Sequence, residues 1–237
     1  MIQLPLVFLP GMMCDARLYM HQIVSLSRRY TLHFAPVCGK DSVREMAEEV
    51  LEHCPSRFVL LGLSLGGMVA MEILAQAADR VCGVVLLDTS PLADSDDIRQ
   101  IRERQIEQAR AGHLHQLLLG QVMPLFHLDG ENGAKTADTF LAMALGMGKE
   151  VFERQSRALQ TRPDQQENLK KAGAPALILC GRNDWLCPLD VHQLMHNLMS
   201  GSHLEIIEDA GHMPTLEQPE ATTAAIERWL ERSITQT

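Results

Sequence analysis

The sequence predicts an α/β protein in which roughly six mainly parallel strands form one sheet with helices on both faces. Short apolar runs typical of strands alternate with segments of helical periodicity, as expected when a helix connects each parallel strand to the next. With 237 residues, 46% of them hydrophobic and 22% charged, the chain suits one domain with a substantial core. The alternation stops between about Pro91 and Thr161, which indicates an insertion.

Each predicted strand is a short run of aliphatic and β-branched residues bounded by Gly, Pro or polar residues. The first run has no basic segment before it and is interrupted by Pro and Gly, so we interpret it as a buried strand and not as a signal peptide. The predicted strands are Pro5–Leu9, Thr31–Pro36, Phe58–Leu63, Val81–Asp88, Ala176–Gly181 and His203–Glu208.

The clearest helix begins after Ser42, because apolar residues repeat on one face as far as Cys54, and Ser42 with Glu45 forms a capping-box pattern. The segment from Leu65 to Ala78 is apolar nearly all round, as expected for a helix packed against a sheet. Near the end of the chain, residues 225–230 carry the apolar stripe of a last helix.

Residues 91–161 contain no strand-like run and are expected to form an inserted helical cap of roughly four helices. Residues 1–90 and 162–237 would then form the core of the fold. The expected helix breakers within the cap are Gly112, Gly120, Pro124, Gly130, Gly133 and Gly148.

Charge and cysteine usage exclude several classes of partner. The formal net charge of -9 has the wrong sign for neutralising phosphates, so we expect no nucleic-acid partner. No segment is long and apolar enough to predict a membrane span. The six cysteines lie in apolar segments without paired spacing, which favours reduced thiols in a cytoplasmic protein, with Cys14 and Cys187 close to a pocket.

The residues 62–66 read Gly-Leu-Ser-Leu-Gly and match the pattern GxSxG. The pattern alone is weak because Gly and Ser are common residues. Here it directly follows a predicted strand and opens a predicted helix, which is the setting of a nucleophile elbow. The tight turn is expected to strain Ser64, the candidate nucleophile.

A serine hydroxyl needs a base within hydrogen-bond reach and a third group to orient that base. His212 follows the last predicted strand, where an open α/β sheet places its site, and is the candidate base. Asp184 follows the preceding strand and is the candidate acid, while Asp88, which also ends a strand, is the rival. His21, His53, His192 and His196 fall in expected helices and are assigned structural or surface positions.

The reaction also needs donors for an oxyanion, typically two backbone amides. The N–H of Leu65, at the start of the helix after Ser64, is the first candidate. The loop after the first strand should supply the second, and we assign it to the N–H of Met12.

Together these motifs resemble the α/β-hydrolase superfamily over essentially the whole chain. The segments 174–184 and 211–220 are similar to the family's approach to its acid and to its histidine loop. The compact size and short cap resemble small carboxylesterases and enol-lactonases. We expect the chain to lack two strands that usually precede the family's oxyanion loop, and Pro10-Gly11 stands where many relatives have His-Gly.

The resemblance implies cleavage of a small carboxylic ester or lactone, without a cofactor or metal, through an acyl-enzyme. Thioester, amide or carbon–carbon bond chemistry on the same site, and a non-catalytic small-molecule receptor, remain alternatives. His113, His115 and His127 in the cap could reach a polar substrate, but their spacing is not that of a zinc site. One set of apolar residues is equally expected to line the substrate pocket or to form the interior of the cap: Leu117, Leu118, Met123, Leu125, Phe126, Phe140 and Met143.

Overall fold

A computed structural model of the chain describes residues 4–126 and 132–234, and in them the expected sheet is present. Its strands lie in the order β2-β1-β3-β4-β5-β6, and every neighbouring pair is parallel. Each strand lies within one of the segments predicted from the sequence. The strands are β1 (Leu6–Leu9), β2 (Leu32–Phe34), β3 (Phe58–Leu63), β4 (Val81–Leu87), β5 (Ala176–Gly181) and β6 (His203–Ile207).

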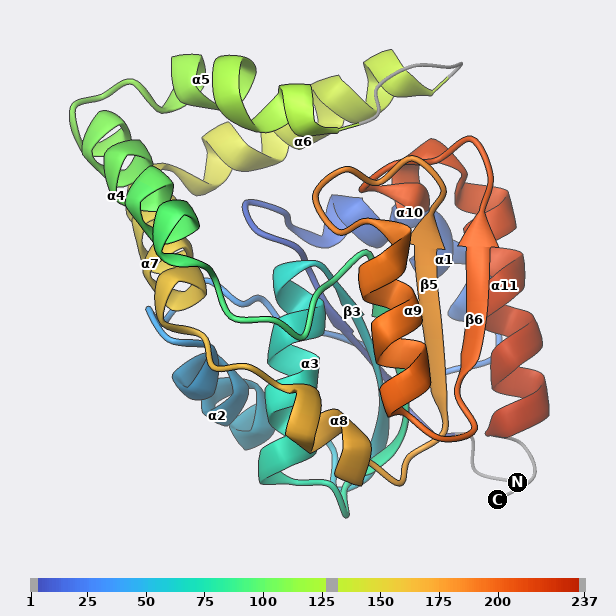
Figure 1. Ribbon diagram of the computed structural model, residues 1–237. Helices are drawn as coiled ribbons and strands as arrows, with labels where there is room; N and C mark the ends of the chain where they lie inside the picture. Colours follow the sequence, from blue (N-terminus) through green and yellow to red (C-terminus); the bar gives the residue numbers. More distant parts are fainter. Residues whose placement is uncertain (1–3, 127–131, 235–237) are drawn as a thin grey trace.

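Helices cover both faces of this sheet (Figure 1). Helices α1 (Met20–Leu26) and α11 (Pro219–Ser233) pack on one face, together with the short segments η1 (Ala16–Tyr19) and α10 (Pro214–Glu217). The other face carries α2 (Val43–His53), α3 (Leu65–Gln76), α8 (Gln166–Lys171) and α9 (Leu189–Leu198). The fold is therefore a three-layer α/β/α arrangement.

Alternation along the strands divides the core into two apolar clusters. Leu6 and Phe8 of β1 belong to the cluster under α1 and α11, whereas Val7 and Leu9 belong to the cluster under α2 and α3. All four side chains are fully buried. Because successive side chains of a strand point to opposite faces, a strand buried on both faces has to be apolar throughout.

Between β4 and β5 the described residues contain only helical segments. They are α4 (Asp96–Arg110), α5 (Leu114–Leu117), η2 (Leu118–Val122), η3 (Met123–Leu125), α6 (Gly133–Met147) and α7 (Lys149–Thr161), followed by α8. Helices α4 to α7, which we call the cap helices, lie beyond one end of the sheet (Figure 1). Gly112 and Gly148 have positive φ angles of 90° and 81° at helix ends, but Gly120 lies inside η2 and ends no helix.

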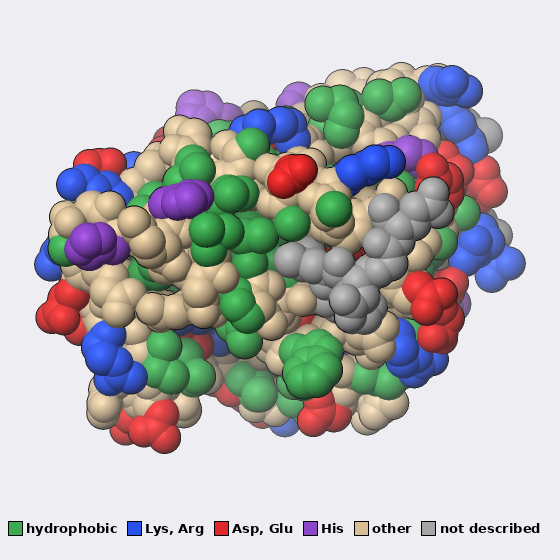
Figure 2. Space-filling view, turned by 90° about the horizontal axis from the view of Figure 1, so that it is seen from above, with side chains coloured by type: hydrophobic (Ala, Val, Ile, Leu, Met, Phe, Trp, Pro, Cys, Tyr) green, Lys and Arg blue, Asp and Glu red, His purple; other side chains and the backbone are tan. Residues whose placement is uncertain are grey.

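The cap helices also carry apolar residues at the surface. Figure 2 views the molecule from this end and shows apolar side chains gathered near the centre of the face. The large exposed apolar residues of these helices are Ile98, Ile101, Leu119, Leu125 and Leu145. In the described residues, no helix combines the length and the apolar character needed to cross a membrane.

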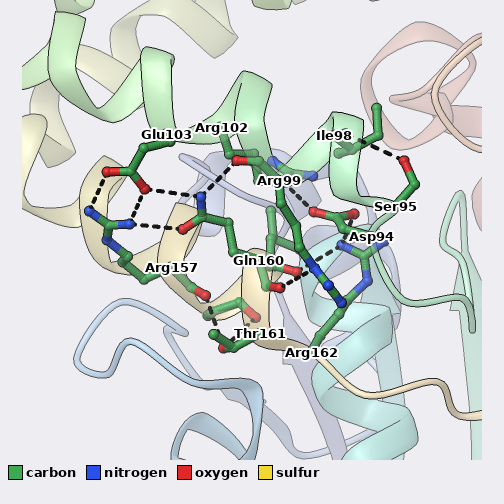
Figure 3. A network of polar contacts seen from close by, with 12 residues as sticks. Asp94, Ser95, Ile98, Arg99, Arg102, Glu103, Arg157, Gln160, Thr161 and Arg162 are labelled. Atoms are coloured by element: carbon green, nitrogen blue, oxygen red, sulfur yellow. Dashed lines mark hydrogen bonds and ion pairs between the residues drawn. The ribbon is translucent and has the colours of Figure 1, made fainter.

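A polar network joins α4 to α7 (Figure 3). Arg157 pairs with Glu103, and the side chain of Gln160 donates to the carbonyl oxygen of Arg99 at 2.9 Å. At the core end of the two helices, Asp94 accepts ion pairs from both Arg162 and Arg102, at 2.7 and 2.5 Å. The Asp94 and Arg162 side chains are only 4% and 9% exposed, so this end of the network is buried.

Replacing Asp94 with Ala is therefore expected to lower the free energy of unfolding by about 3 kcal/mol or more, because two arginines would lose their counter-charge in a buried position. Urea denaturation measures the change. The matched control is Asp96→Ala, since Asp96 is 89% exposed and pairs with Arg99 at the surface. That variant should change stability by less than about 1 kcal/mol. Equal losses in both variants would contradict a buried anchor at Asp94.

Candidate active site

The predicted site residues gather at one edge of the sheet. Because the strands are parallel, the loops after β1, β3, β4, β5 and β6 leave the sheet at the same end. These loops carry Met12, Ser64, Asp88, Asp184 and His212, respectively. The cap helices lie beyond this same edge (Figure 1).

The turn between β3 and α3 holds Ser64 in a strained conformation, with φ 55° and ψ -117°. The two flanking glycines are needed because other backbone atoms lie very close. A Cβ atom on Gly66 would lie 2.0 Å from the carbonyl oxygen of Leu9, and one on Gly62 would lie 2.4 Å from the carbonyl oxygen of Gly66. The GxSxG spacing therefore reflects a close approach of β3, α3 and β1 as well as the exposure of a serine.

Ser64, His212 and Asp184 form a continuous hydrogen-bonded chain. The His212 Nε2 atom lies 3.0 Å from Ser64 Oγ, and the His212 Nδ1 atom lies 2.8 Å from Asp184 Oδ2. His212 and Asp184 are each 5% exposed, whereas Ser64 is partly buried. This is the order of contacts required for a nucleophile, its base and the group that orients the base.

Asp184 is held as a carboxylate. Burial disfavours its charge, but the neighbouring His212 and the hydrogen bonds from His212 and two backbone amides outweigh this effect and lower the pKa of Asp184. Those amides are the N–H groups of Leu186 and Cys187, at 2.8 and 3.0 Å from Oδ1. With both oxygens occupied, the carboxylate can hold only one orientation of the imidazole.

Asp88, the rival acid, lies beside Asp184 and has no hydrogen bond to His212 among the described residues. It is fully buried, has a positive φ of 42°, and accepts the N–H of Gly181 at 2.8 Å through Oδ1. Burial, reinforced by the charge of Asp184, raises the pKa of Asp88 well above its ordinary value. Asp88 is thus a neutral acid next to an ionised one, since two adjacent buried carboxyl groups do not both ionise.

Glu217 holds the loop that carries His212, a role that the sequence analysis did not assign. Its carboxylate accepts the N–H groups of Gly211 and Met213, which flank His212, the second at 2.8 Å. The side chain is almost fully buried. An acidic residue five positions after the histidine, at the end of the short α10, was the available signal.

Both candidate oxyanion donors belong to segments close to Ser64. Leu65 is the first residue of α3, where N–H groups have no acceptor within the helix. The Met12 loop lies close by, because a Cβ on Gly11 would be 3.5 Å from Ser64 Cβ. Within residues 4–126 and 132–234, neither N–H donates a hydrogen bond to another residue.

Phe126, directly after η3, covers the imidazole of His212. The two rings stack with 5.8 Å between centroids and an angle of 13° between planes, and Phe140 contacts Phe126 edge-on. Four other residues named for the pocket or the cap interior, Leu117, Leu118, Phe140 and Met143, are buried in one apolar cluster with Phe126, whereas Leu125 is 43% exposed. The wall of the site next to His212 is therefore aromatic.

The other histidines singled out in the sequence lie at the surface or in the core, or outside the described residues. His113 and His115 are exposed at the surface, and His127 lies outside the described residues. His192 is fully buried, and its Nε2 atom accepts the N–H of Thr89 at 3.2 Å. Burial lowers the pKa of His192, so it stays neutral and supports the loop after β4.

The six cysteines are all free thiols, and two of them lie near the site. Burial raises the pKa of both Cys14 and Cys187, which leaves these thiols protonated and poorly nucleophilic. Cys187 also lies near Asp184 and His212, and in the described residues these three form the one group of His, Cys and acidic side chains close enough to hold a metal ion. The hydrogen bond between Asp184 and His212 already accounts for two of its members.

A separate hollow of about 250 Å³ lies between the end of β2 and α2. Its lining includes His33, Cys38, Glu49 and His53, and shares no residue with the predicted site. The candidate active site around Ser64 is therefore separate from this hollow.

Comparison with known proteins finds relatives and structural neighbours that are named esterases. A curated protein of Nitrosomonas europaea named pimeloyl-(acyl-carrier protein) methyl ester esterase is 26% identical over 236 residues, which cover 91% of each chain. A thermophilic esterase from Thermogutta terrifontis matches with a TM-score of 0.89 and 26% identity over 97% of this chain and 90% of that one.

The enol-lactonase of Burkholderia xenovorans matches with a TM-score of 0.85 at 19% identity, over 97% of this chain and 92% of that one, and so shares the fold. A family model described as the alpha/beta hydrolase family matches residues 6–226, nearly the whole chain. This chain therefore belongs to the alpha/beta hydrolase family.

Proposed function

We propose that this protein is a serine hydrolase that cleaves a small carboxylic ester or lactone through an acyl-enzyme. The observation that carries the proposal is the hydrogen-bonded chain from Ser64 Oγ through His212 to Asp184, with distances of 3.0 and 2.8 Å. In this assignment Ser64 is the nucleophile, His212 the general base and Asp184 the acid that orients and stabilises the imidazolium.

In the first half of the reaction, Ser64 Oγ attacks the carbonyl carbon of the ester while its proton moves to His212 Nε2. The tetrahedral oxyanion accepts hydrogen bonds from the N–H groups of Met12 and Leu65. His212 then returns the proton to the leaving alcohol, and the bond between carbon and the alcohol oxygen breaks. An acyl-enzyme and a free alcohol result.

In the second half, a water molecule gives a proton to His212 and attacks the acyl carbon. The tetrahedral intermediate again places its oxyanion between Met12 and Leu65. When it collapses, Ser64 Oγ leaves with the proton from His212, and the carboxylic acid is released. The step restores the starting protonation of all three side chains.

The aromatic and aliphatic surroundings of the site support an acyl group of low polarity. Phe126 stacks on His212, and the apolar cluster that contains Phe126 extends into the cap. We also propose residues 91–161 as the cap that closes over the substrate. The named activities of the relatives, a methyl ester esterase and a thermophilic esterase, agree with an ester substrate.

The first test is hydrolysis of p-nitrophenyl acetate, butyrate and octanoate, phenyl acetate and a simple lactone by the wild type and by Ser64→Ala. We expect turnover by the wild type and a loss of at least about 10³-fold in the variant, because only oxyanion binding would remain. Equal activity in both would exclude Ser64 as the nucleophile. If neither protein turns over any substrate, the receptor alternative or a different bond type would replace the proposal.

A second test separates the two acids. Asp184→Asn should lower kcat by about 10³- to 10⁴-fold, since an amide stabilises the wrong tautomer of His212 and no imidazolium. Asp88→Asn is the matched variant, because an amide keeps an acceptor for Gly181 and stays neutral like the acid that it replaces. Its kcat should remain within about threefold of the wild type. A larger loss in Asp88→Asn than in Asp184→Asn would reverse the assignment.

The protonation of Asp88 gives a prediction about stability. In the folded protein the pKa of Asp88 is raised, whereas in the unfolded chain it ionises near its ordinary value of 3.8. At this site the unfolded state therefore binds fewer protons above that value, so the contribution of Asp88 to wild-type stability falls as the pH rises, by up to ~1.4 kcal/mol per pH unit.

Asp88→Asn has no such dependence, so urea denaturation at about pH 5 and about pH 7 should show the variant gaining stability relative to the wild type at the higher pH. A stability difference that does not change with pH would mean that Asp88 is ionised in the folded protein.

A further inference from the structure

Gln155 of α7 joins the cap helices to the loop that carries Met12. Its side chain is fully buried, although it is polar and lies 142 positions from the residue that it contacts in this loop. The Oε1 atom accepts the N–H of Met13 at 2.8 Å, and the Nε2 atom donates to the carbonyl oxygen of Val37 at 2.8 Å. One amide therefore binds the loops that follow β1 and β2.

The orientation of this amide follows from its two partners. A backbone N–H requires the oxygen end of the amide, and a carbonyl oxygen requires the NH₂ end. Burial makes both bonds costly to lose, because neither group could be compensated by water. A side chain of the same size without these groups would fill the space but leave the Met13 N–H unpaired.

The contact lies in the middle of a tight turn formed by residues 11–14, which we call the oxyanion turn. Its ends are closed by a hydrogen bond from the Cys14 N–H to the Gly11 carbonyl oxygen at 3.1 Å. Met13 has a positive φ of 58°, a conformation that side chains other than glycine rarely adopt. The turn therefore needs an external contact to hold this conformation against unstrained alternatives.

Gln155 supplies that contact on one side of the peptide that joins Met12 to Met13. On the same peptide, the Met12 carbonyl oxygen accepts the thiol of Cys14 at 3.4 Å. If the bond to Gln155 were lost, this peptide could rotate and Met13 could leave its strained conformation. The adjacent N–H of Met12 would then move relative to Ser64.

We propose that Gln155 is a positioning residue that holds the oxyanion turn against Ser64, so that its hydrogen bond to the Met13 N–H controls how well the tetrahedral intermediate is stabilised. The proposal rests on the ester-hydrolase function proposed above. It assigns to α7 a second role beyond covering the substrate, because the same helix is anchored to α4 through Arg157 and Glu103.

A neighbouring residue provides a control. Arg154 lies next to Gln155 on α7, and its Nε atom donates to the carbonyl oxygen of Cys38 at 2.9 Å. This bond fastens α7 to the loop after β2 without touching the oxyanion turn. Arg154→Met therefore removes one hydrogen bond between α7 and the loop after β2, while it leaves the Met13 N–H paired.

The experiment compares Gln155→Met, Gln155→Glu and Arg154→Met with the wild type. Steady-state kinetics with p-nitrophenyl butyrate gives kcat and KM, and inhibition by an alkyl trifluoromethyl ketone reports on oxyanion binding. Inhibition by the corresponding methyl ketone, which is neutral and forms little tetrahedral adduct, is the ground-state comparison. Thermal unfolding records the stability of each variant.

We expect Gln155→Met to lower kcat and trifluoromethyl ketone affinity by about 10- to 100-fold, with KM and methyl ketone affinity within about threefold. Arg154→Met should keep kcat within about threefold. Gln155→Glu should retain more activity than Gln155→Met, because it keeps an acceptor for the Met13 N–H. A purely structural role predicts the reverse order, since an apolar isostere suits a buried position better than a carboxyl group.

Three outcomes would overturn the proposal: equal kcat in Gln155→Met and Arg154→Met, a change in KM alone, or higher activity in Gln155→Met than in Gln155→Glu. If Gln155→Glu does not fold, the comparison of kcat between Gln155→Met and Arg154→Met still tests the proposal. Ser64→Ala distinguishes a failure of the role proposed for Gln155 from a failure of the proposed function. Loss of activity in Ser64→Ala with a wild-type-like Gln155→Met would overturn only the role of Gln155, whereas an active Ser64→Ala would overturn the proposed function and this inference together.

Discussion

The packing of helix α3 against the end of β1 sets the geometry on which the site depends. Gly66 lies so close to Leu9 that a Cβ atom would stand 2.0 Å from its carbonyl oxygen. This approach directs the turn after β3 into the conformation with positive φ at Ser64. It also brings the loop after β1 beside the first amide of α3. The nucleophile and both candidate oxyanion donors are thus placed by one contact between backbones.

Buried polar groups then fix the side chains around that contact. Glu217 binds the amides on both sides of His212, and Asp184 receives three hydrogen bonds, one of them from His212. Asp88 stays neutral beside Asp184, because burial and the adjacent charge raise its pKa. Asp184 therefore supplies the negative charge in contact with the imidazole, which is the charge that the proposed imidazolium intermediate needs.

The cap helices take part in the same arrangement. Helix α7 is tied to α4 by the polar network of Figure 3 and to the oxyanion turn by Gln155. Phe126 meanwhile packs on His212 from the cap side. A helical segment inserted between β4 and β5 thus touches both the proposed base and the proposed oxyanion site, so cap position and chemistry are physically connected.

The sequence by itself determined the sheet and the identity of the central residues. Strands buried on both faces must be apolar, and parallel strands place their following loops together, so local patterns were enough to indicate Ser64, Asp184 and His212. The tertiary structure was needed to distinguish Asp184 from its rival Asp88, and it alone revealed the raised pKa of Asp88 and the contact of Gln155 with Met13. Those properties depend on burial and on hydrogen bonds between residues far apart in the chain, such as the 142 positions between Met13 and Gln155, and no local pattern encodes such distances.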